Sequence, residues 1–517
     1  MAVFSDTTPP TAPAGYGHLR GNQGFTAAAR DGLNNATQRR NLQHATTTIR
    51  NKRAAAVAEI DDWQELRAAG SAIKEDVAAR LPELLEQFEQ QVTQRGGTVH
   101  WARDAQEANE IVTSLIQATG ETEVVKVKSM ATQEIALNEH LAEQGIHARE
   151  TDLAELIVQL GEDKPSHILV PAIHRNRSEI RDIFVDSMPD VDDTLAAEPA
   201  ELAEASRLFL REQFMKAKVA ISGANFGVAE TGTVTVVESE GNGRMCLTLP
   251  ETLITVMGIE KLVPTFQDLE VFLQLLPRSS TAERMNPYTS MWTGVTEGDG
   301  PQNFHIVLLD NGRTAALSSP VGAQALKCIR CSACLNVCPV YERAGGHAYG
   351  STYPGPIGIA LTPQLTGMKD HHDPSASLPY ACSLCGRCDE VCPVKIPLSD
   401  VILENRYQKA KHATPPVESK LFNLVLFAWA RPQVWNRLTR MASLGRFLGG
   451  RNGVMDSLPL FLSGWSDARD TAVPAKQSFR EWFESNEAKN LLSEARGQGL
   501  PITDVSGTSK RTDVAED

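Results

Sequence analysis

The chain has 517 residues, more than a single hydrophobic core normally organises, so its length predicts roughly two to four domains. Hydrophobic residues make up 42% of the sequence and charged residues 22%, a composition typical of globular proteins rather than of disordered or membrane-spanning chains. The formal net charge is −14, and no concentrated Lys/Arg cluster stands out. These two features argue against nucleic acid as a main partner.

Residues 1–45 are expected to form a flexible N-terminal tail, because the opening stretch is rich in Pro, Thr and Gly and lacks the apolar segment of a secretory signal. The longest apolar run near the C-terminus, residues 421–430, is about half of what spans a bilayer. We therefore expect no transmembrane segment and a cytoplasmic location. In that reducing compartment a dense cysteine pattern indicates metal ligation or catalysis rather than disulfides.

Residues 46–310 predict an α/β domain with a mostly parallel sheet and helices at its N-terminal end. Apolar residues recur at helical spacing over residues 51–94, and Gly96 and Gly97 follow. Short segments rich in Val and Ile then alternate with amphipathic stretches. The predicted strands are 124–128, 168–171, 219–222, 233–237 and 304–309, and the predicted helices are 132–144, 177–184 and 200–218.

The sequence changes character after residue 310. Residues 311–400 hold all but one of the cysteines among many Gly and Pro, as expected for a domain held together by ligation. Residues 401–500 predict a helical C-terminal domain, and residues 501–517 a polar tail. The apolar side chains at positions 422, 426, 427 and 429 admit contact with a membrane surface or a partner, but packing on the protein's own core is the favoured interpretation.

The chemistry is carried by two copies of the motif C-x2-C-x2-C-x3-C-P, separated by the 43 residues 339–381. Three thiolates at three-residue intervals allow one loop to bind three irons of a cubane, and the fourth cysteine reaches the other cluster in two-cluster ferredoxins. The spacing thus predicts two [4Fe–4S] clusters. The predicted ligands are Cys328, Cys331, Cys334 and Cys392 for the first cluster, and Cys382, Cys385, Cys388 and Cys338 for the second.

Two alternatives compete with redox-active clusters. Zinc sites usually come as paired C-x2-C elements rather than as runs of four cysteines ending in Cys-Pro. Purely structural clusters are the other alternative, but crossed ligands imply a close pair of clusters, which suits electron transfer. The ninth cysteine, Cys246, stands alone and is interpreted as a small buried hydrophobic residue.

A second candidate site, for an anion, is expected in the α/β domain. The stretch ISGANFGVAETGT, residues 221–233, resembles a strand followed by a loop that presents backbone amides to a ligand, although it matches neither the dinucleotide fingerprint nor the P-loop. Basic side chains after two other predicted strands lie where such sheets bind ligands; solvated or capping charges are the alternative. The candidate residues are Lys128, Ser129, His174, Arg175, Gly223, Glu230 and Thr231.

The loop between the cysteine motifs, GGHAYGSTYPGPIG at residues 345–358, is dense in Gly and Pro and predicts tight turns. Its side chains His347, Tyr349 and Tyr353 either line a site or belong to a rigid loop packed over the clusters.

Several of these segments resemble the lactate utilization protein B family. The likeness is carried by KVKSM (126–130), ETDLAELIVQL (150–160), PSHILVPAIH (165–174), ISGANFGVAETGT, EGNGRMCLTLP (240–250), GIEKLVP (258–264), the paired cysteine motifs, the loop 345–358 and SFREWF (478–483). The resemblance implies a LUD domain of the sugar-isomerase/CoA-transferase-like α/β type, an α-rich two-cluster ferredoxin-type domain and a helical C-terminal region.

The resemblance also implies a function. The family acts with a cysteine-rich subunit and a second LUD-domain protein to oxidise L-lactate to pyruvate, and this chain is expected to be the iron–sulfur electron-transfer subunit. No flavin or nicotinamide motif is evident, so the hydride-removing centre is expected on a partner, and no catalytic residue is assigned. Alternatives are the same relay serving another 2-hydroxy acid or a glycerol-phosphate-type dehydrogenase, and a ligand-binding redox sensor without turnover.

Overall fold

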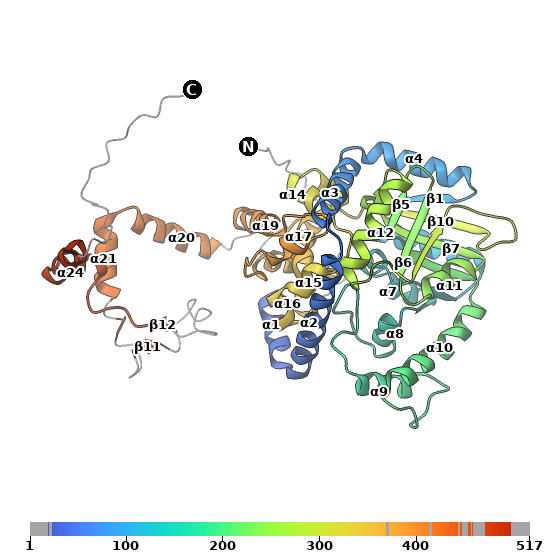
Figure 1. The fold of residues 1–517 in the computed structure, drawn as a ribbon, viewed down its shortest axis with the longest axis horizontal. Coiled ribbons are helices and arrows are strands. Elements are labelled where there is room, and N and C mark those ends of the chain that lie inside the picture. Colours follow the sequence, from blue (N-terminus) through green and yellow to red (C-terminus); the bar gives the residue numbers. More distant parts are fainter. Residues whose placement is uncertain are drawn as a thin grey trace. The chain divides into compact units, whose positions relative to one another are not determined.

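The computed structural model describes residues 19, 23–368, 372–412, 416–442, 445–446, 453–455, 458 and 471–497. The chain divides into two compact units, residues 1–414 and residues 415–517, and each is described by itself (Figure 1). The predicted polar tail 501–517 and residues 1–18 and 20–22 of the predicted N-terminal tail lie outside the described residues.

The first unit is built on a six-stranded sheet in which all neighbouring strands are parallel, so the predicted fold class is confirmed (Figure 1). In spatial order its strands are β1 (Thr98–Ala102), β10 (Asn303–Leu309), β7 (Thr252–Gly258), β4 (Val219–Gly223), β2 (Glu123–Lys126) and β3 (His147–Glu150). A four-stranded sheet lies beside it, with the order β8 (Leu262–Val263), β5 (Phe226–Val228), β6 (Thr233–Glu238) and β9 (Tyr288–Trp292).

Both faces of the parallel sheet are buried, which explains its continuous apolar strands. Along β10, Phe304, Ile306 and Leu308 point into one hydrophobic cluster, and Val307 and Leu309 into another. Alternation of side chains along a strand produces this division.

Helices cover both sheet faces and precede the sheet. They are α1 (Phe25–Asn34), α2 (Ala36–Ala58), α3 (Trp63–Ala79), α4 (Leu81–Gln94), α5 (Ala105–Thr119), α6 (Met130–Glu134), α7 (Leu137–Glu143), α8 (Leu153–Leu160), α9 (Arg177–Ser187), α10 (Pro199–Lys216), α11 (Asn242–Thr248), η1 (Ile259–Lys261), α12 (Phe266–Ser280), α13 (Arg313–Leu317) and α14 (Pro320–Leu326). The cysteine-containing part has α15 (Ala333–Val337), α16 (Pro339–Ala344), η2 (His347–Tyr349), α17 (Gly355–Thr366), η3 (Pro374–Tyr380), α18 (Arg387–Val391) and α19 (Leu398–His412).

The prediction of a flexible tail over residues 1–45 is wrong from Phe25 onward. Helices α1 and α2 pack against the cysteine-containing part: Phe25 donates its backbone N–H to Ser377, and Leu42 is fully buried in the same hydrophobic cluster as five buried cysteines. The opening segment misled the prediction because its composition differs from that of the helices that follow it.

Two other predicted elements differ from the structure, and a central strand was missed. Residues 168–171 form a turn, in which Pro171 accepts a backbone hydrogen bond from Ser166. The single helix predicted over 132–144 is two helices, α6 and α7, since Ala136 adopts a left-handed conformation with φ of 48°. Strand β7, which is buried along its whole length, was not predicted.

The α/β and cysteine-containing parts share one hydrophobic cluster, in which Phe226, Phe272 and Leu275 from the former join Cys328 and Cys334. The predicted boundary at residue 400 falls inside α19, which packs on α17 and η3. The cysteine-containing part is therefore anchored to the α/β part by apolar packing.

The second unit contains α20 (Pro416–Trp429), α21 (Pro432–Ala442), β11 (Val454–Met455), β12 (Thr471–Ala472), α23 (Phe479–Glu484) and α24 (Asn486–Gly497). Within this unit the side chains of Phe422, Leu426, Phe427 and Trp429 are each more than half exposed, so they do not pack into a core of the second unit itself. In the described parts of the chain, no helix combines the length and apolarity needed to cross a membrane.

Candidate functional site

The first cysteine motif forms a tight loop followed by the short helix α15. Arg330 and Ser332, which lie between its first three cysteines, have φ angles of 62° and 64°. These left-handed residues turn the backbone back on itself, so that Cys328, Cys331 and Cys334 approach one another.

The second motif repeats the same backbone pattern. Leu384 and Gly386 occupy the positions equivalent to Arg330 and Ser332, and their φ angles are 56° and 74°. Helix α18 follows this loop as α15 follows the first, and the two helices pack against each other. The two motifs therefore have matching backbone turns.

The eight motif cysteines gather in two groups. Cys328, Cys331, Cys334 and Cys392 line one small cavity together. Burial, with the nearby thiolates of Cys328 and Cys392, raises the pKa of Cys331 to about 12. Burial likewise raises the pKa of Cys338 to about 11, and its cysteine neighbours are Cys382 and Cys385.

The donor set fits iron–sulfur clusters. None of the nine cysteines forms a disulfide. The small cavity is lined by three cysteines of the first motif and by Cys392 of the second. Burial raises the pKa of the Cys331, Cys334, Cys338 and Cys392 thiols, so a bound cation is needed to stabilise their thiolate forms. Backbone N–H groups of residues 330, 341, 384 and 396 donate to the sulfur atoms of Cys328, Cys338, Cys382 and Cys392 at 3.2–3.5 Å. Such bonds tune cluster potentials.

The two groups differ in exposure. The thiols of the first group are buried, whereas Cys338 and Cys382 in the second are half-buried and Cys385 is exposed. Leu384 beside Cys385 is 39% exposed. The second group therefore reaches the surface of its unit at Cys385, while its fourth member, Cys388, is buried.

Arginines from the N-terminal helices hold the second motif in place. Arg67 of α3 donates to the carbonyl oxygens of Cys392 at 2.9 Å and of Asp389 at 3.2 Å. Arg53 of α2 donates to the carbonyl oxygen of Val391 at 2.8 Å. The helices thus supply cations next to a predicted cluster, where they offset thiolate charge.

A larger cavity, about 320 Å³ in volume, lies where the α/β part meets the first cysteine loop. It opens at the carboxyl ends of the neighbouring strands β2, β4 and β7, where parallel sheets usually bind ligands. Three of the predicted anion-site residues, Lys128, Ser129 and Gly223, line it. A Cβ atom at Gly223 would lie 2.3 Å from Ser129 Oγ, so glycine is required for the strand ends to approach.

Arg313 fixes the base of this junction cavity. Its guanidinium donates to both carboxylate oxygens of Glu134 at 2.8 and 3.0 Å and to Glu260 Oε2 at 2.6 Å, with all three side chains buried. Burial alone would raise the pKa of Glu260, but Arg313 and neighbouring Lys261 lower it to about 2. The Glu260 carboxylate therefore stays ionised although its side chain is buried.

The cysteine loop enters the same network. The Arg330 guanidinium, from between Cys328 and Cys331, donates to Glu260 Oε1 at 3.4 Å and lies 4.5 Å from the Tyr353 ring centre. Tyr353 in turn donates to Glu134 Oε2 at 2.5 Å. Both Arg330 and Tyr353 line the cavity, so this loop and the α/β part build it jointly.

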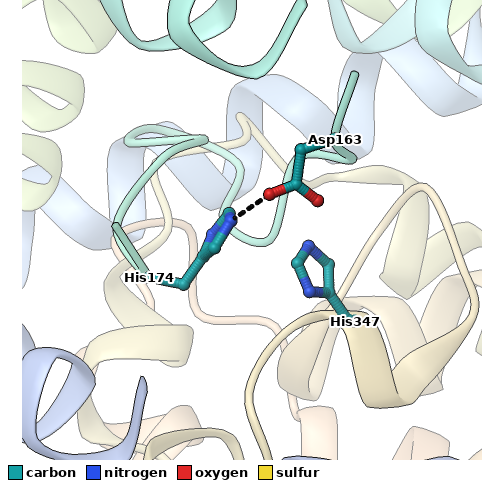
Figure 2. Close-up of side chains that lie close together, drawn as sticks. All are labelled: Asp163, His174 and His347. Atoms are coloured by element: carbon teal, nitrogen blue, oxygen red, sulfur yellow. Dashed lines mark hydrogen bonds and ion pairs between the residues drawn. The ribbon is translucent and has the colours of Figure 1, made fainter. Parts of the chain in front are cut away.

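The other predicted anion-site residues lie elsewhere. His174 Nε2 is 2.9 Å from Asp163 Oδ2, and Arg175 donates to the same oxygen at 3.0 and 2.5 Å. Figure 2 shows the Asp163–His174 contact beside His347 of the loop between the motifs, and the two histidine rings lie edge to face 4.7 Å apart. Burial would raise the pKa of Asp163, but hydrogen bonds from His174, Lys164 and Arg175 lower it.

These contacts make the Asp163 cluster a structural junction between the two parts of the unit. His174 Nδ1 contacts Ser166 Oγ at 2.7 Å and His347 Nε2 contacts the Lys164 carbonyl at 2.7 Å, so both rings are already engaged. The single predicted anion site is therefore divided in the structure.

Glu230 and Thr231 are also outside the junction cavity. The Glu230 carboxylate accepts the backbone N–H of Phe266 at the start of α12, and Thr231 Oγ1 bonds Thr233 Oγ1 at 2.7 Å. Cys246 is fully buried 3.5 Å from Thr151 Oγ1, as predicted.

The site also contains four charged residues that were not predicted from the sequence: Arg330, Glu260, Arg313 and Lys261. Lys261 lines the cavity, and burial together with the Arg330 cation lowers its pKa to about 7. Arg330 lies within the first cysteine motif and Lys261 within the family segment GIEKLVP, so the sequence around each residue could have indicated a functional role. That both residues line one cavity could not be predicted, because 69 positions separate them in the chain.

Comparison with protein families assigns residues 85–309 to the LUD domain and residues 324–396 to the 4Fe-4S dicluster domain. The second match confirms the predicted pair of [4Fe–4S] clusters as cofactors.

Curated relatives cover almost the whole chain. "Lactate utilization protein B" of Oceanobacillus iheyensis is 42% identical over 87% of this chain and 94% of its own, and the Bacillus subtilis protein of the same name is 38% identical over 92% and 98%. "Uncharacterized electron transport protein YkgF" of Escherichia coli is 41% identical over 90% and 98%. A solved Deinococcus radiodurans DUF162 family protein matches 44% of this chain with 16% identity and a TM-score of 0.23. By its relatives, its two family domains and its paired cysteine motifs, the chain belongs to the lactate utilization protein B family.

Proposed function

We propose that this protein is the iron–sulfur electron-transfer subunit of a complex that oxidises L-lactate to pyruvate. The observation that carries the proposal is the gathering of four thiols from both cysteine motifs around one cavity, in a chain that matches lactate utilization protein B over most of its length. The oxidation releases two electrons and two protons, and two [4Fe–4S] clusters that each take one electron match that number.

The proposed ligation is crossed. Cys328, Cys331, Cys334 and Cys392 hold one cluster, and Cys382, Cys385, Cys388 and Cys338 hold the other. The shared cavity supports the first set, and the electrostatic neighbours of Cys338 and Cys388 support the second. Crossed ligands keep the two clusters close together, as an electron relay requires.

The direction of the relay follows from burial. The first set of thiols adjoins the junction cavity through Arg330, whereas the second reaches the surface at Cys385. Electrons then enter at the buried cluster and leave at the exposed one, where a partner docks. A cysteine-rich subunit and a second LUD-domain subunit are the proposed partners, and the cytoplasm, which keeps these thiols reduced, is the proposed location.

Anaerobic purification of the tagged chain with its bound partners, followed by EPR, tests the proposal. Reduced-cluster signals are expected to grow on addition of L-lactate and to stay absent with buffer. If glycerol 3-phosphate or another 2-hydroxy acid reduced the clusters and L-lactate did not, the protein would be the electron-transfer subunit for the oxidation of that substrate instead. If dithionite reduced the clusters but no substrate did so with the partners present, the result would favour the alternative of a ligand-binding redox sensor.

A further inference from the structure

The polar groups of the junction cavity are incompletely paired. Arg313 makes side-chain hydrogen bonds of 2.6–3.0 Å to two carboxylates, but the two hydrogen bonds of the Arg330 guanidinium, to Glu260 and to the Cys328 carbonyl, are both 3.4 Å long. Arg330 is 9% exposed, and its Nε is buried without a hydrogen-bond partner. A guanidinium has five donors in a planar fork, and leaving them unpaired in a buried site costs free energy.

A second basic side chain, Lys261, lines the same cavity; its anionic neighbour is Glu260, which it does not contact directly. Among the described residues, none makes a hydrogen bond or an ion pair with the Lys261 ammonium group. By contrast, Lys128 donates to the Leu169 carbonyl oxygen at 2.7 Å. The cavity therefore offers two basic groups, Arg330 and Lys261, for an incoming anion, and a bound anion would favour the protonated form of Lys261.

The walls restrict which anion fits. Ile168, Val170 and Val236 provide apolar surface suited to a short aliphatic substituent, whereas the carboxylates of Asp152 and Glu238 line the same cavity and disfavour anions of higher charge. A volume of about 320 Å³ suits a small molecule. An arginine fork matches a planar carboxylate better than a lysine does.

We propose that the junction cavity binds the carboxylate of a small 2-hydroxy or 2-oxo monocarboxylic acid, with Arg330 and Lys261 as its binding residues. The choice of acid rests on the proposed lactate function. The Arg330 backbone N–H also donates to Cys328 Sγ at 3.3 Å, so the ligand lies against the loop of the first thiol set. The substrate of the complex is thus held by this chain, next to the point where electrons enter the relay.

Isothermal titration of the anaerobically purified, cluster-loaded chain with L-lactate, pyruvate and inorganic phosphate tests this site. Saturable binding of L-lactate or pyruvate is expected, with phosphate at least tenfold weaker. Lys261→Gln should weaken carboxylate binding at least tenfold, and the exposed Lys52→Gln on α2 should leave it unchanged. Equal binding by the Lys261→Gln protein, or preference for phosphate, would overturn the proposal.

A second variant and a comparison with cluster reduction separate the failure of this site from the failure of the proposed function. Leu169→Trp enlarges a side chain that lines the cavity while keeping Arg330 and Lys261, and it should also weaken binding. Iron content and visible absorbance verify that each variant carries its clusters. Binding without lactate-dependent cluster reduction in the complex would remove the relay role but retain the site. Lactate-dependent reduction with no binding to this chain would retain the relay and assign the substrate to a partner.

Discussion

The guanidinium carbon of Arg330 lies 4.5 Å from the centre of the Tyr353 ring. Arg330 belongs to the first cysteine motif, and Tyr353 to the loop between the motifs. The same tyrosine donates to Glu134 of α6, so a single contact chain runs from the cysteine loop into the α/β part. This connection makes the ligand cavity and the first thiol set neighbours.

Replacing the cation at the base of this connection should strongly destabilise the protein. Arg313→Met leaves Glu134 and Glu260 buried without their main partner, and the free energy of unfolding should fall by about 3–5 kcal/mol. The matched control Arg284→Met removes an exposed ion pair with Glu59 and should change stability by less than about 1 kcal/mol. Denaturant unfolding of both variants measures the difference, and equal effects would show that the buried network contributes nothing special.

Serine variants of the cysteines test crossed ligation. Cys392→Ser and Cys328→Ser should remove the same cluster signal from the EPR spectrum of the reduced protein, although 64 positions separate them. Cys382→Ser should remove the other signal. If Cys392→Ser instead matched Cys382→Ser, each motif would bind its own cluster. The buried Cys246→Ala serves as the control and should retain both signals.

Helix α2 should behave as part of the core. Leu42 is fully buried among the residues around the cysteines, so Leu42→Ala should lower the free energy of unfolding by about 2–5 kcal/mol. Leu33→Ala on α1, where the side chain is 45% exposed, should cost much less. A flexible tail over these residues would make the two variants indistinguishable from the parent protein in thermal or denaturant unfolding.

Because His167 is buried, the free energy of unfolding should decrease at mildly acidic pH. Burial, together with the Lys128 cation, lowers its pKa to about 3, and its Nδ1 accepts backbone N–H groups from Leu169 and Val170 at 3.0 Å. The unfolded chain binds a proton near pH 6.5 that the folded chain excludes, so stability is full above that pH and declines as pH falls toward 3.

The contribution is measurable by comparison with His167→Gln. The slope of unfolding free energy between pH 6.5 and 5 should be shallower in this variant, by up to about 1.4 kcal/mol per pH unit. Denaturant unfolding at several pH values gives both slopes. Parallel slopes for the two proteins would show that His167 is protonated in the folded state.

The sequence by itself determined the cofactors and the fold class. Ligand identity and spacing are local properties, so two copies of C-x2-C-x2-C-x3-C-P were sufficient to predict two clusters, and the family resemblance extended this prediction to the LUD domain. Alternating apolar strands and amphipathic helices likewise predicted the parallel sheet, because side-chain periodicity reports burial directly.

Only the tertiary structure decided which charged residues share a site. Lys128 and Gly223 both line the junction cavity at adjacent strand ends. His174 and Arg175 contact Asp163 instead, and the basic residues Lys261 and Arg330 line the cavity in their place. Buried charges must find partners, and that pairing depends on strand order and on the packing of the cysteine loop against the sheet rather than on any local pattern. The burial of α2 against the cysteine region is also a long-range packing result, which composition near the N-terminus did not indicate.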